Sequence, residues 1–135
     1  MFVVLTKRNL KEETATKVPI IVLAGASWNK DCRKMRGILE EIEEEYKGRR
    51  NQKVKFATLN VDQERKIAES WGIVHGFKLR IPALIFIKDG MMVERIYKSM
   101  TKDDLLMKMA QFVSPGDERT DTAYSSEFKL TNLGI

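Results

Sequence analysis

The sequence predicts a single α/β domain built on a mixed sheet. Apolar runs of strand length alternate with amphipathic helical patterns from Met1 to Val113, as expected for strands connected by helices. The run Ile20 to Leu23 is uninterrupted and β-branched, which is typical of a strand buried on both faces. Asp89-Gly90 separates the last two strand-like runs and is a strong two-residue hairpin signal. We therefore expect the order β-α-β-α-β-α-β-β-α, with about five strands flanked by about four helices.

In the first half, Phe2 to Thr6 (FVVLT) predicts a short strand, and Thr6 can cap a helix over about Lys7 to Thr16. The longest helix is predicted over Lys30 to Lys47, because apolar residues recur at helical spacing and charged residues fill the other faces. The predicted apolar stripe consists of Cys32, Met35, Leu39, Ile42 and Tyr46. Gly48 is a suitable residue to end this helix.

In the second half, Val54 to Val61 predicts a strand, and Asp62 is expected to open a helix that Gly72 ends. Trp71 lies on the apolar phase of that helix and is expected in the core. The following stretch, residues 73–80 (IVHGFKLR), shows no clear period and is expected to be a looser loop.

The last elements are a hairpin and a helix. Ala83 to Lys88 and Met91 to Tyr97 predict the two strands on either side of Asp89-Gly90. Thr101, with an acidic residue three positions later, forms a start that resembles a capping box. We expect a domain over residues 1–113 and a tail over 114–135 that is mobile or loosely docked, since termini are poorly ordered unless tied down.

The composition excludes several classes of protein. The chain has 135 residues, 43% hydrophobic and 32% charged, as in a soluble globular protein. Its longest apolar run, Val18 to Ala26, is far shorter than the about 20 residues that span a bilayer, so we expect no membrane partner. Charge follows the N-terminus too early for a signal-peptide core, and a single cysteine excludes an internal disulfide; both indicate a cytoplasmic location. With one cysteine and one histidine, we expect no metal site.

The net charge of +5 is moderately basic, which favours an acidic partner. Basic and acidic runs alternate along the chain, so the alternative is charge spread over a solvated surface. No motif supports nucleic-acid binding, although basic character alone permits a non-specific form of it.

Four stretches together resemble the thioredoxin family: IIVLAGA, SWNKDCRKM, FATLNVDQERKIAESWGI and RIPALIFIKDG. The combination is specific, because Trp-x-x-x-Cys is followed about fifty residues later by Ile-Pro-Ala, an apolar strand and Lys-Asp-Gly. The resemblance covers about Met1 to Val113. It implies the thioredoxin fold and a cis peptide bond between Ile81 and Pro82.

Three departures from the family pattern bear on activity. A typical thioredoxin has Trp-Cys-Gly-Pro-Cys, whereas this chain has Trp28-Asn29-Lys30-Asp31-Cys32. The resemblance therefore implies that Asn29 stands in place of the nucleophilic cysteine and that only the resolving position, Cys32, is kept. Leu23 stands where the family has a buried acid, and the stretch before Pro82 is longer by several residues. These departures imply a degenerate site.

Dithiol–disulfide exchange needs one thiolate to attack and a second to resolve the mixed disulfide, so one cysteine cannot complete the cycle within the molecule. Asn29 can be interpreted instead as an ordinary helix N-cap, and Cys32 as a buried core residue. Trp28 is either a wall of a binding groove or a core residue. His75, the only histidine, is expected to be a loop residue without an acid–base role.

One cluster of charge stands out. In the thioredoxin fold the start of the site helix faces the segment before Pro82 across the substrate groove. Four basic side chains, which we call the basic rim, would then surround Asn29 at a helix N-terminus, an arrangement that binds anions. The basic rim consists of Lys30, Arg33, Lys78 and Arg80.

The favoured hypothesis is a thioredoxin-like protein without dithiol oxidoreductase activity. It would act as a protein-binding or assembly module through the groove near Asn29 and Pro82, without a cofactor. An extended peptide would pair with the Ile81 backbone by strand addition, and the basic rim would select an acidic partner. The predicted binding residues are Trp28, Asn29, Lys30, Arg33, Arg80, Ile81 and Pro82.

Two alternatives stay open. The protein could be a monothiol thiol–disulfide oxidoreductase or glutathione-dependent enzyme with Cys32 as the catalytic residue, which requires an accessible thiol of low pKa. Anionic glutathione would suit the basic rim. Alternatively, Asn29 is an engineered replacement of a catalytic cysteine, and the parent sequence is that of an ordinary thioredoxin with Trp-Cys-Lys-Asp-Cys.

Overall fold

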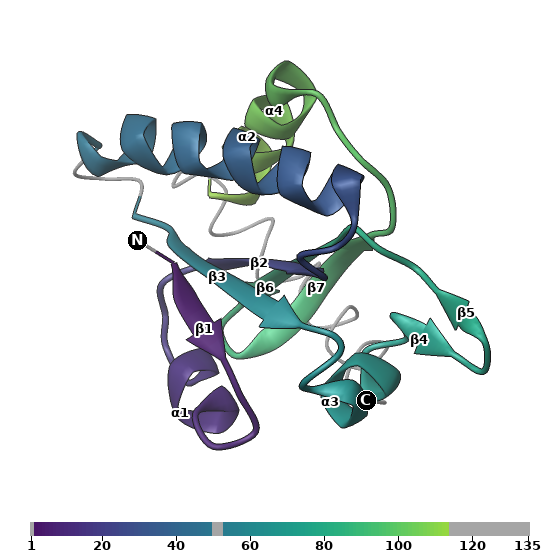
Figure 1. The fold of residues 1–135 in the computed structure, drawn as a ribbon. Helices are drawn as coiled ribbons and strands as arrows, with labels where there is room; N and C mark the ends of the chain where they lie inside the picture. The colour runs from purple at the N-terminus through teal and green to yellow at the C-terminus, as the bar shows by residue number, and fades with distance from the viewer. Residues whose placement is uncertain (1, 50–52, 114–135) are drawn as a thin grey trace.

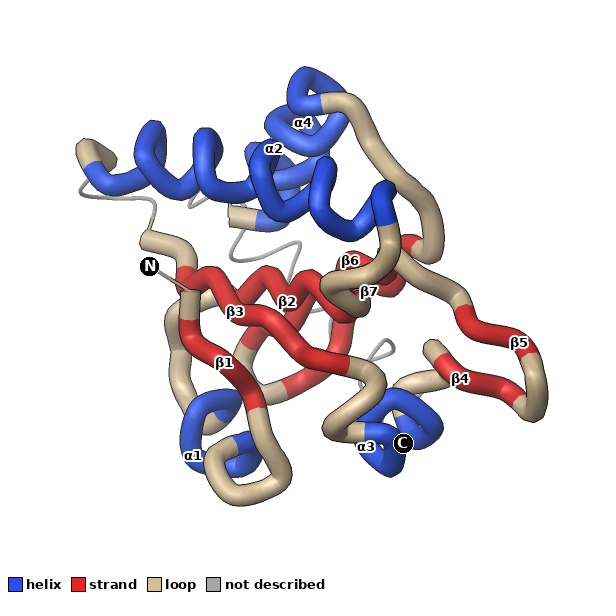
Figure 2. Tube along the Cα trace, in the orientation of Figure 1, coloured by secondary structure: helices blue, strands red, loops and turns tan. Residues whose placement is uncertain are grey.

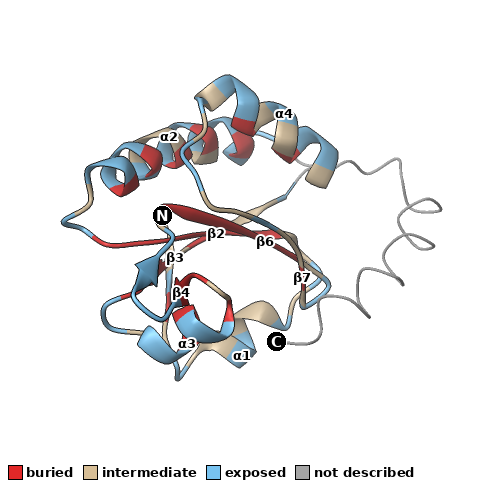
Figure 3. Ribbon diagram, turned by 90° about the vertical axis from the view of Figure 1, so that its right-hand side faces the viewer, coloured by how far each residue is buried: buried red, intermediate tan, exposed pale blue. Residues whose placement is uncertain are grey.

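A computed structural model describes residues 2–49 and 53–113 of the chain. It has three layers: a five-stranded mixed sheet lies between α2 and α4 on one face and α1 and α3 on the other (Figures 1 and 3). This confirms the predicted α/β architecture: a five-stranded central sheet flanked by four helices in the described part of the chain. The predicted tail over 114–135 lies outside the described residues.

The elements follow one another in the predicted order, with the strands β4 and β5 added between α3 and β6. In chain order they are β1 (Val3–Leu5), α1 (Leu10–Thr14), β2 (Ile20–Gly25), α2 (Lys30–Lys47), β3 (Lys55–Asn60), α3 (Arg65–Ser70), β4 (Val74–His75), β5 (Lys78–Leu79), β6 (Ala83–Lys88), β7 (Met91–Ile96) and α4 (Lys102–Phe112).

The sheet has the strand order β1-β3-β2-β6-β7, with the first three strands parallel and the last two antiparallel to their neighbours (Figure 2). All six residues of β2 are buried, because β2 is the central strand and helices cover both of its faces. Val22 and Ala24 face the core beneath α1 and α3, whereas Ile21 and Leu23 face the core beneath α2 and α4. The uninterrupted apolar run was therefore a correct signal of a doubly buried strand.

The helix α2 begins and ends at the predicted residues. Its buried side chains are the five of the predicted stripe, Cys32, Met35, Leu39, Ile42 and Tyr46. Gly48 is its C-cap.

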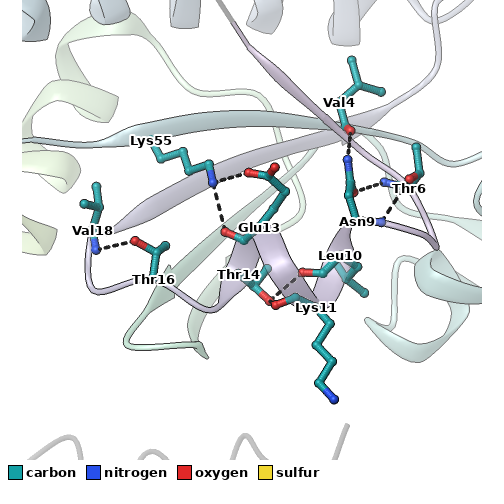
Figure 4. Close-up of polar contacts among 10 residues, drawn as sticks. All are labelled: Val4, Thr6, Asn9, Leu10, Lys11, Glu13, Thr14, Thr16, Val18 and Lys55. Atoms are coloured by element: carbon teal, nitrogen blue, oxygen red, sulfur yellow. Dashed lines mark hydrogen bonds and ion pairs between the residues drawn. The ribbon is translucent and has the colours of Figure 1, made fainter.

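The predicted start of the first helix was wrong: α1 begins at Leu10 rather than Lys7. Thr6 and Asn9 hold a turn over the intervening residues, as Figure 4 shows. The Thr6 backbone N–H donates to Asn9 Oδ1 at 2.7 Å, and the Asn9 N–H donates to Thr6 Oγ1 at 3.3 Å. These side chains satisfy backbone groups that a helix would otherwise use, so the helix starts one turn later.

The short α1 is tied to the sheet by a polar contact at its end. Lys55 Nζ donates to the backbone oxygen of Glu13 at 3.1 Å and forms an ion pair with the Glu13 carboxylate (Figure 4). Because both side chains are partly buried, this contact links α1 to the start of β3.

The predicted helix from Asp62 to Gly72 also begins later, at Arg65. The side chain of Asn60 accepts hydrogen bonds from the backbone of Asp62 at 2.9 Å and Gln63 at 3.2 Å, which folds those residues into a turn. Gly72 follows the helix with φ of +75°, a conformation that favours glycine.

The expectation of a loop over residues 73–80 was wrong, because β4 and β5 pair there as a small hairpin. His75 pairs with Lys78, and Gly76-Phe77 forms the two-residue connection, with Gly76 at φ of +62°. Glycine at the first position of such a connection is a recognised hairpin preference. The strands have two residues each, too few to show a period in the sequence.

The final predicted hairpin is confirmed: Lys88 pairs with Met91 around Asp89 and Gly90, whose φ angles are +54° and +76°. The cap of α4 is also confirmed, since Thr101 Oγ1 accepts a hydrogen bond from the Asp104 backbone N–H at 3.1 Å. None of the helices in the described residues is long and apolar enough to cross a membrane.

Candidate functional site

The candidate site lies where β2 leads into α2. Ala26, Ser27 and Trp28 connect the end of the central strand to the N-cap of the helix at Asn29. Ala83, the first residue of β6, pairs with Ala24 near the end of β2, which puts Pro82 beside the strand end that leads into α2. The fold thus brings the two predicted segments to the same end of the sheet.

Asn29 caps α2. Its backbone is extended, with φ of −91° and ψ of 124°, and its Oδ1 accepts a hydrogen bond from the Cys32 backbone N–H at 2.9 Å. This side chain satisfies one of the N–H groups that have no partner within the helix. The interpretation of Asn29 as an N-cap is confirmed.

Cys32 is a packed residue with 5% of its surface exposed. Its Sγ lies over Gly25 so closely that a Cβ atom built at Gly25 would be 2.6 Å from it. Burial raises the pKa of the Cys32 thiol, and the charge of Asp31 raises it further; a backbone hydrogen bond with Ala26 acts in the opposite direction. The described contacts therefore favour the neutral thiol, which is the less reactive form.

Leu23 lies in the core beneath α2, with 5% of its surface exposed. Its register partners are Thr58 on β3 and Leu84 on β6. Within residues 2–49 and 53–113 no carboxylate, histidine or lysine side chain is buried, so no described buried base can take a proton from Cys32.

Trp28 is exposed over 60% of its surface, so its interpretation as a core residue was wrong. Its indole Nε1 donates to Asp62 Oδ2 at 2.8 Å, which links the loop before α2 to the turn after β3. This hydrogen bond holds a large apolar ring at the surface beside the helix start. Trp71, by contrast, is buried as predicted.

The two arginines of the basic rim make contacts on opposite faces of the sheet. Arg33, on α2, donates from Nη1 to the Ser27 backbone oxygen at 2.8 Å. The Arg80 guanidinium lies 5.2 Å from the ring centre of Tyr97, which packs against the core on the α3 side. Lys30 and Lys78 are exposed. No contact among the described residues joins the four side chains, so the rim as a single anion site stays a prediction.

Pro82 is buried and Ile81 is half-buried, and the peptide bond between them is cis. The Arg80 backbone N–H donates to the Ile73 oxygen at 2.8 Å, which closes the base of the β4–β5 hairpin. The position of Pro82 is therefore set by β6 on one side and by this hairpin on the other.

The sequence did not identify the apolar surface of the β4–β5 hairpin. Phe77, in its connection, is fully exposed, and 39% of the surface of Leu79 is exposed. Gly76 was the sequence signal for this hairpin, because glycine favours the first position of a two-residue connection. Phe77 then occupies the second position of the connection, where its side chain is exposed. His75 is an exposed residue of β4.

Among the described residues, no group of three histidine, cysteine, aspartate or glutamate side chains could hold a metal ion.

Comparison with known proteins places these observations in a family. The Thioredoxin family profile matches residues 1–111. A thioredoxin of Alicyclobacillus acidocaldarius is 31% identical over 106 residues, which cover 78% of this chain and 92% of that protein. Thioredoxin 1 of Nostoc sp. is 29% identical over 101 residues, which cover 74% and 86%.

Among solved structures, a mutant thioredoxin from Halobacterium salinarum superimposes with a TM-score of 0.69 at 18% identity, covering 84% of this chain and 90% of that one. This likeness confirms the thioredoxin fold. The family match over residues 1–111 and the 31% identity to the Alicyclobacillus acidocaldarius thioredoxin establish that this protein is a member of the thioredoxin family.

Proposed function

We propose that this protein is a protein-binding module of the thioredoxin family that does not carry out dithiol–disulfide exchange. The observation that carries the proposal is the start of α2, where Asn29 caps the helix and the only cysteine of the chain, Cys32, is buried in the first turn. Exchange needs an exposed thiolate and a second thiol. The relatives named above are thioredoxins; this chain shares their family but lacks the second thiol that exchange needs. It includes a cytoplasmic location and no cofactor.

The proposed binding surface comprises Trp28 and the β4–β5 hairpin. Trp28, Phe77 and Leu79 are three of the large apolar side chains that the described residues leave exposed. Figure 1 shows the start of α2 and the hairpin toward the same end of the molecule. Exposed aromatic and aliphatic side chains beside positive charge fit a peptide with apolar residues between acidic ones. Lys78 supplies exposed positive charge within the hairpin.

The redox half of the proposal is tested by insulin reduction with dithiothreitol as the electron source. We expect no acceleration by micromolar protein, because Cys32 has no second thiol within the molecule. The variant Asn29→Cys supplies that thiol and is expected to show at least weak turnover. Turnover by the unmodified protein would overturn the proposal. A folded but inactive Asn29→Cys would show that Leu23 or the hairpin also disables exchange.

The binding half is tested by fluorescence anisotropy with a labelled peptide that has a Leu-Phe centre and two acidic residues on each side. We expect saturable binding, and little binding of the same peptide with lysines in place of the acids. Phe77→Ser should weaken binding by about tenfold, as for loss of an apolar anchor. Met107→Ser is the matched control, because Met107 is 66% exposed but lies on α4. Equal effects of the two substitutions would contradict the proposed surface.

A further inference from the structure

A pocket of about 310 Å³ lies between the first half of α2 and the strands β1, β3 and β2. This volume lies at the lower end of the range for pockets that bind small organic molecules. The pocket does not depend on the proposed protein-binding function.

The floor of the pocket follows from the register of the sheet. Leu23 pairs with Thr58, and Thr58 pairs with Val4, so the three side chains form one row across β2, β3 and β1 on the α2 face. Gly25 and Asn60 form the next row. Val4 is 55% exposed, because it lies on the edge strand and α2 leaves it uncovered. The floor is therefore apolar with two polar side chains.

The wall of the pocket is basic. Arg33 and Arg36 extend from the first half of α2, and Cys32 closes the end against Gly25. None of the lining residues is acidic. Arg36 Nε lies 3.7 Å from Glu40, an exposed pair that contributes little, and its guanidinium lies 5.4 Å from the ring centre of Phe2. One nitrogen of Arg33, Nη1, is used by Ser27, which leaves its other donors for a ligand.

Polar donors also lie on the floor. Asn60 Oδ1 accepts hydrogen bonds from the backbone of Asp62 and Gln63, so the donor that this side chain can offer a ligand is its Nδ2 amide. The Thr58 hydroxyl lies in the row between two apolar side chains. A carboxylate accepts hydrogen bonds from guanidinium, amide and hydroxyl groups alike, and charge-assisted bonds to arginine are the strongest of these.

We infer that this pocket binds a small organic carboxylate, with the carboxylate at Arg33 and Arg36 and an apolar body over Val4, Thr58 and Leu23. A molecule of this class matches the charge of the wall, the apolarity of the floor and the volume. A neutral molecule would leave the arginines unused, and an inorganic anion would leave the floor empty.

The test is a titration of the full chain with 4-phenylbutyrate, followed by the backbone amide signals in ¹H–¹⁵N NMR. We expect saturable shifts at Thr58, Asn60 and Arg36. 4-Phenylbutanol, which lacks the charge, should bind about tenfold more weakly or worse. Shifts spread over the whole surface, or none in the millimolar range, would overturn the inference.

Variants locate the site. Arg33→Gln and Arg36→Gln should each weaken binding by about fivefold to tenfold, since each removes a charged donor. Lys34→Gln carries the same charge change on the exposed face of α2 and should leave affinity within about twofold. Thr58→Phe fills the middle of the floor and should abolish the shifts while circular dichroism stays unchanged. Equal affinity for Arg36→Gln and Lys34→Gln, or for the acid and the alcohol, would refute the assignment.

Discussion

The contact between Gly25 and Cys32 makes a quantitative prediction for Gly25→Ala. The new Cβ would lie 2.6 Å from Cys32 Sγ and 3.0 Å from its Cβ, which is closer than non-bonded atoms approach. Gly25 is a buried residue of the central strand, and its backbone oxygen accepts a hydrogen bond from the Val61 N–H at 3.1 Å, so the backbone cannot easily move away. Overpacking of this kind costs about 1–3 kcal/mol. Alanine offsets about 0.4–1 kcal/mol by restricting the unfolded chain. Taking the middle of each range, we expect a net loss of about 1 kcal/mol in the free energy of unfolding.

The assay is urea denaturation followed by circular dichroism, arranged as a double-mutant cycle with Cys32→Ala. Removing Sγ eliminates the 2.6 Å contact, so the cost of Gly25→Ala should fall by about 1 kcal/mol in that background. Gly37→Ala is the matched control: nothing lies within 4 Å of its Cβ position on α2, and it should stabilise by about 0.5–1 kcal/mol. A neutral Gly25→Ala, or the same cost with and without Sγ, would refute the description of Cys32 as a tightly packed core residue.

Two further predictions concern the start of α2. Asn29→Ala should lower the free energy of unfolding by about 1 kcal/mol in urea denaturation, because the 2.9 Å cap to Cys32 is lost, whereas Asn29→Ser should keep most of it; equal losses would argue against a capping role. The second prediction concerns pH. Because folding raises the pKa of Cys32, the folded state holds the proton to higher pH than the unfolded state, and stability should fall as pH rises above about 8.5, the ordinary thiol value. Cys32→Ala has no thiol to titrate. The difference in the free energy of unfolding between the unmodified protein and Cys32→Ala should therefore shrink as pH rises from neutral to alkaline, and a constant difference would contradict a raised pKa.

Long periodic elements and caps could be predicted from the sequence because their signals are local. The helix over Lys30–Lys47 carries five turns of one apolar stripe between an Asn cap and a glycine, and the structure agrees at both ends. Asp89-Gly90 likewise has a single favoured conformation, and both residues adopt positive φ. The strand over Ile20–Gly25 was recognisable because both of its faces are apolar.

The errors arose where side chains compete with the backbone or where an element is very short. The side chains of Thr6 and Asn9 bond to backbone groups before α1, and the side chain of Asn60 does so before α3. Both helices therefore begin later than the spacing of apolar residues predicts. The β4–β5 hairpin has strands of two residues and no period to detect.

In the candidate site, too, locally determined features were predictable and those set by tertiary packing were not. The N-cap role of Asn29 and the burial of Cys32 follow from their positions on the helix, and both were predictable. Arg33 bonds to Ser27 at the start of its own helix, whereas the contact of Arg80 with Tyr97 depends on tertiary packing that the sequence does not reveal. The pocket over Thr58 exists because three strands align in one register, and that alignment is also a property of the folded sheet.

The most direct test of the central claim is the rate of Cys32 alkylation by iodoacetamide as a function of pH, in native protein and in urea. We predict slow native labelling that accelerates by orders of magnitude on unfolding, because a buried thiol reacts only when the structure opens. Its native pH midpoint should lie above about 8.5, the ordinary thiol value. Fast native labelling with a midpoint well below that value would contradict the account and would make Cys32 a monothiol nucleophile, with glutathione as the first co-substrate to try.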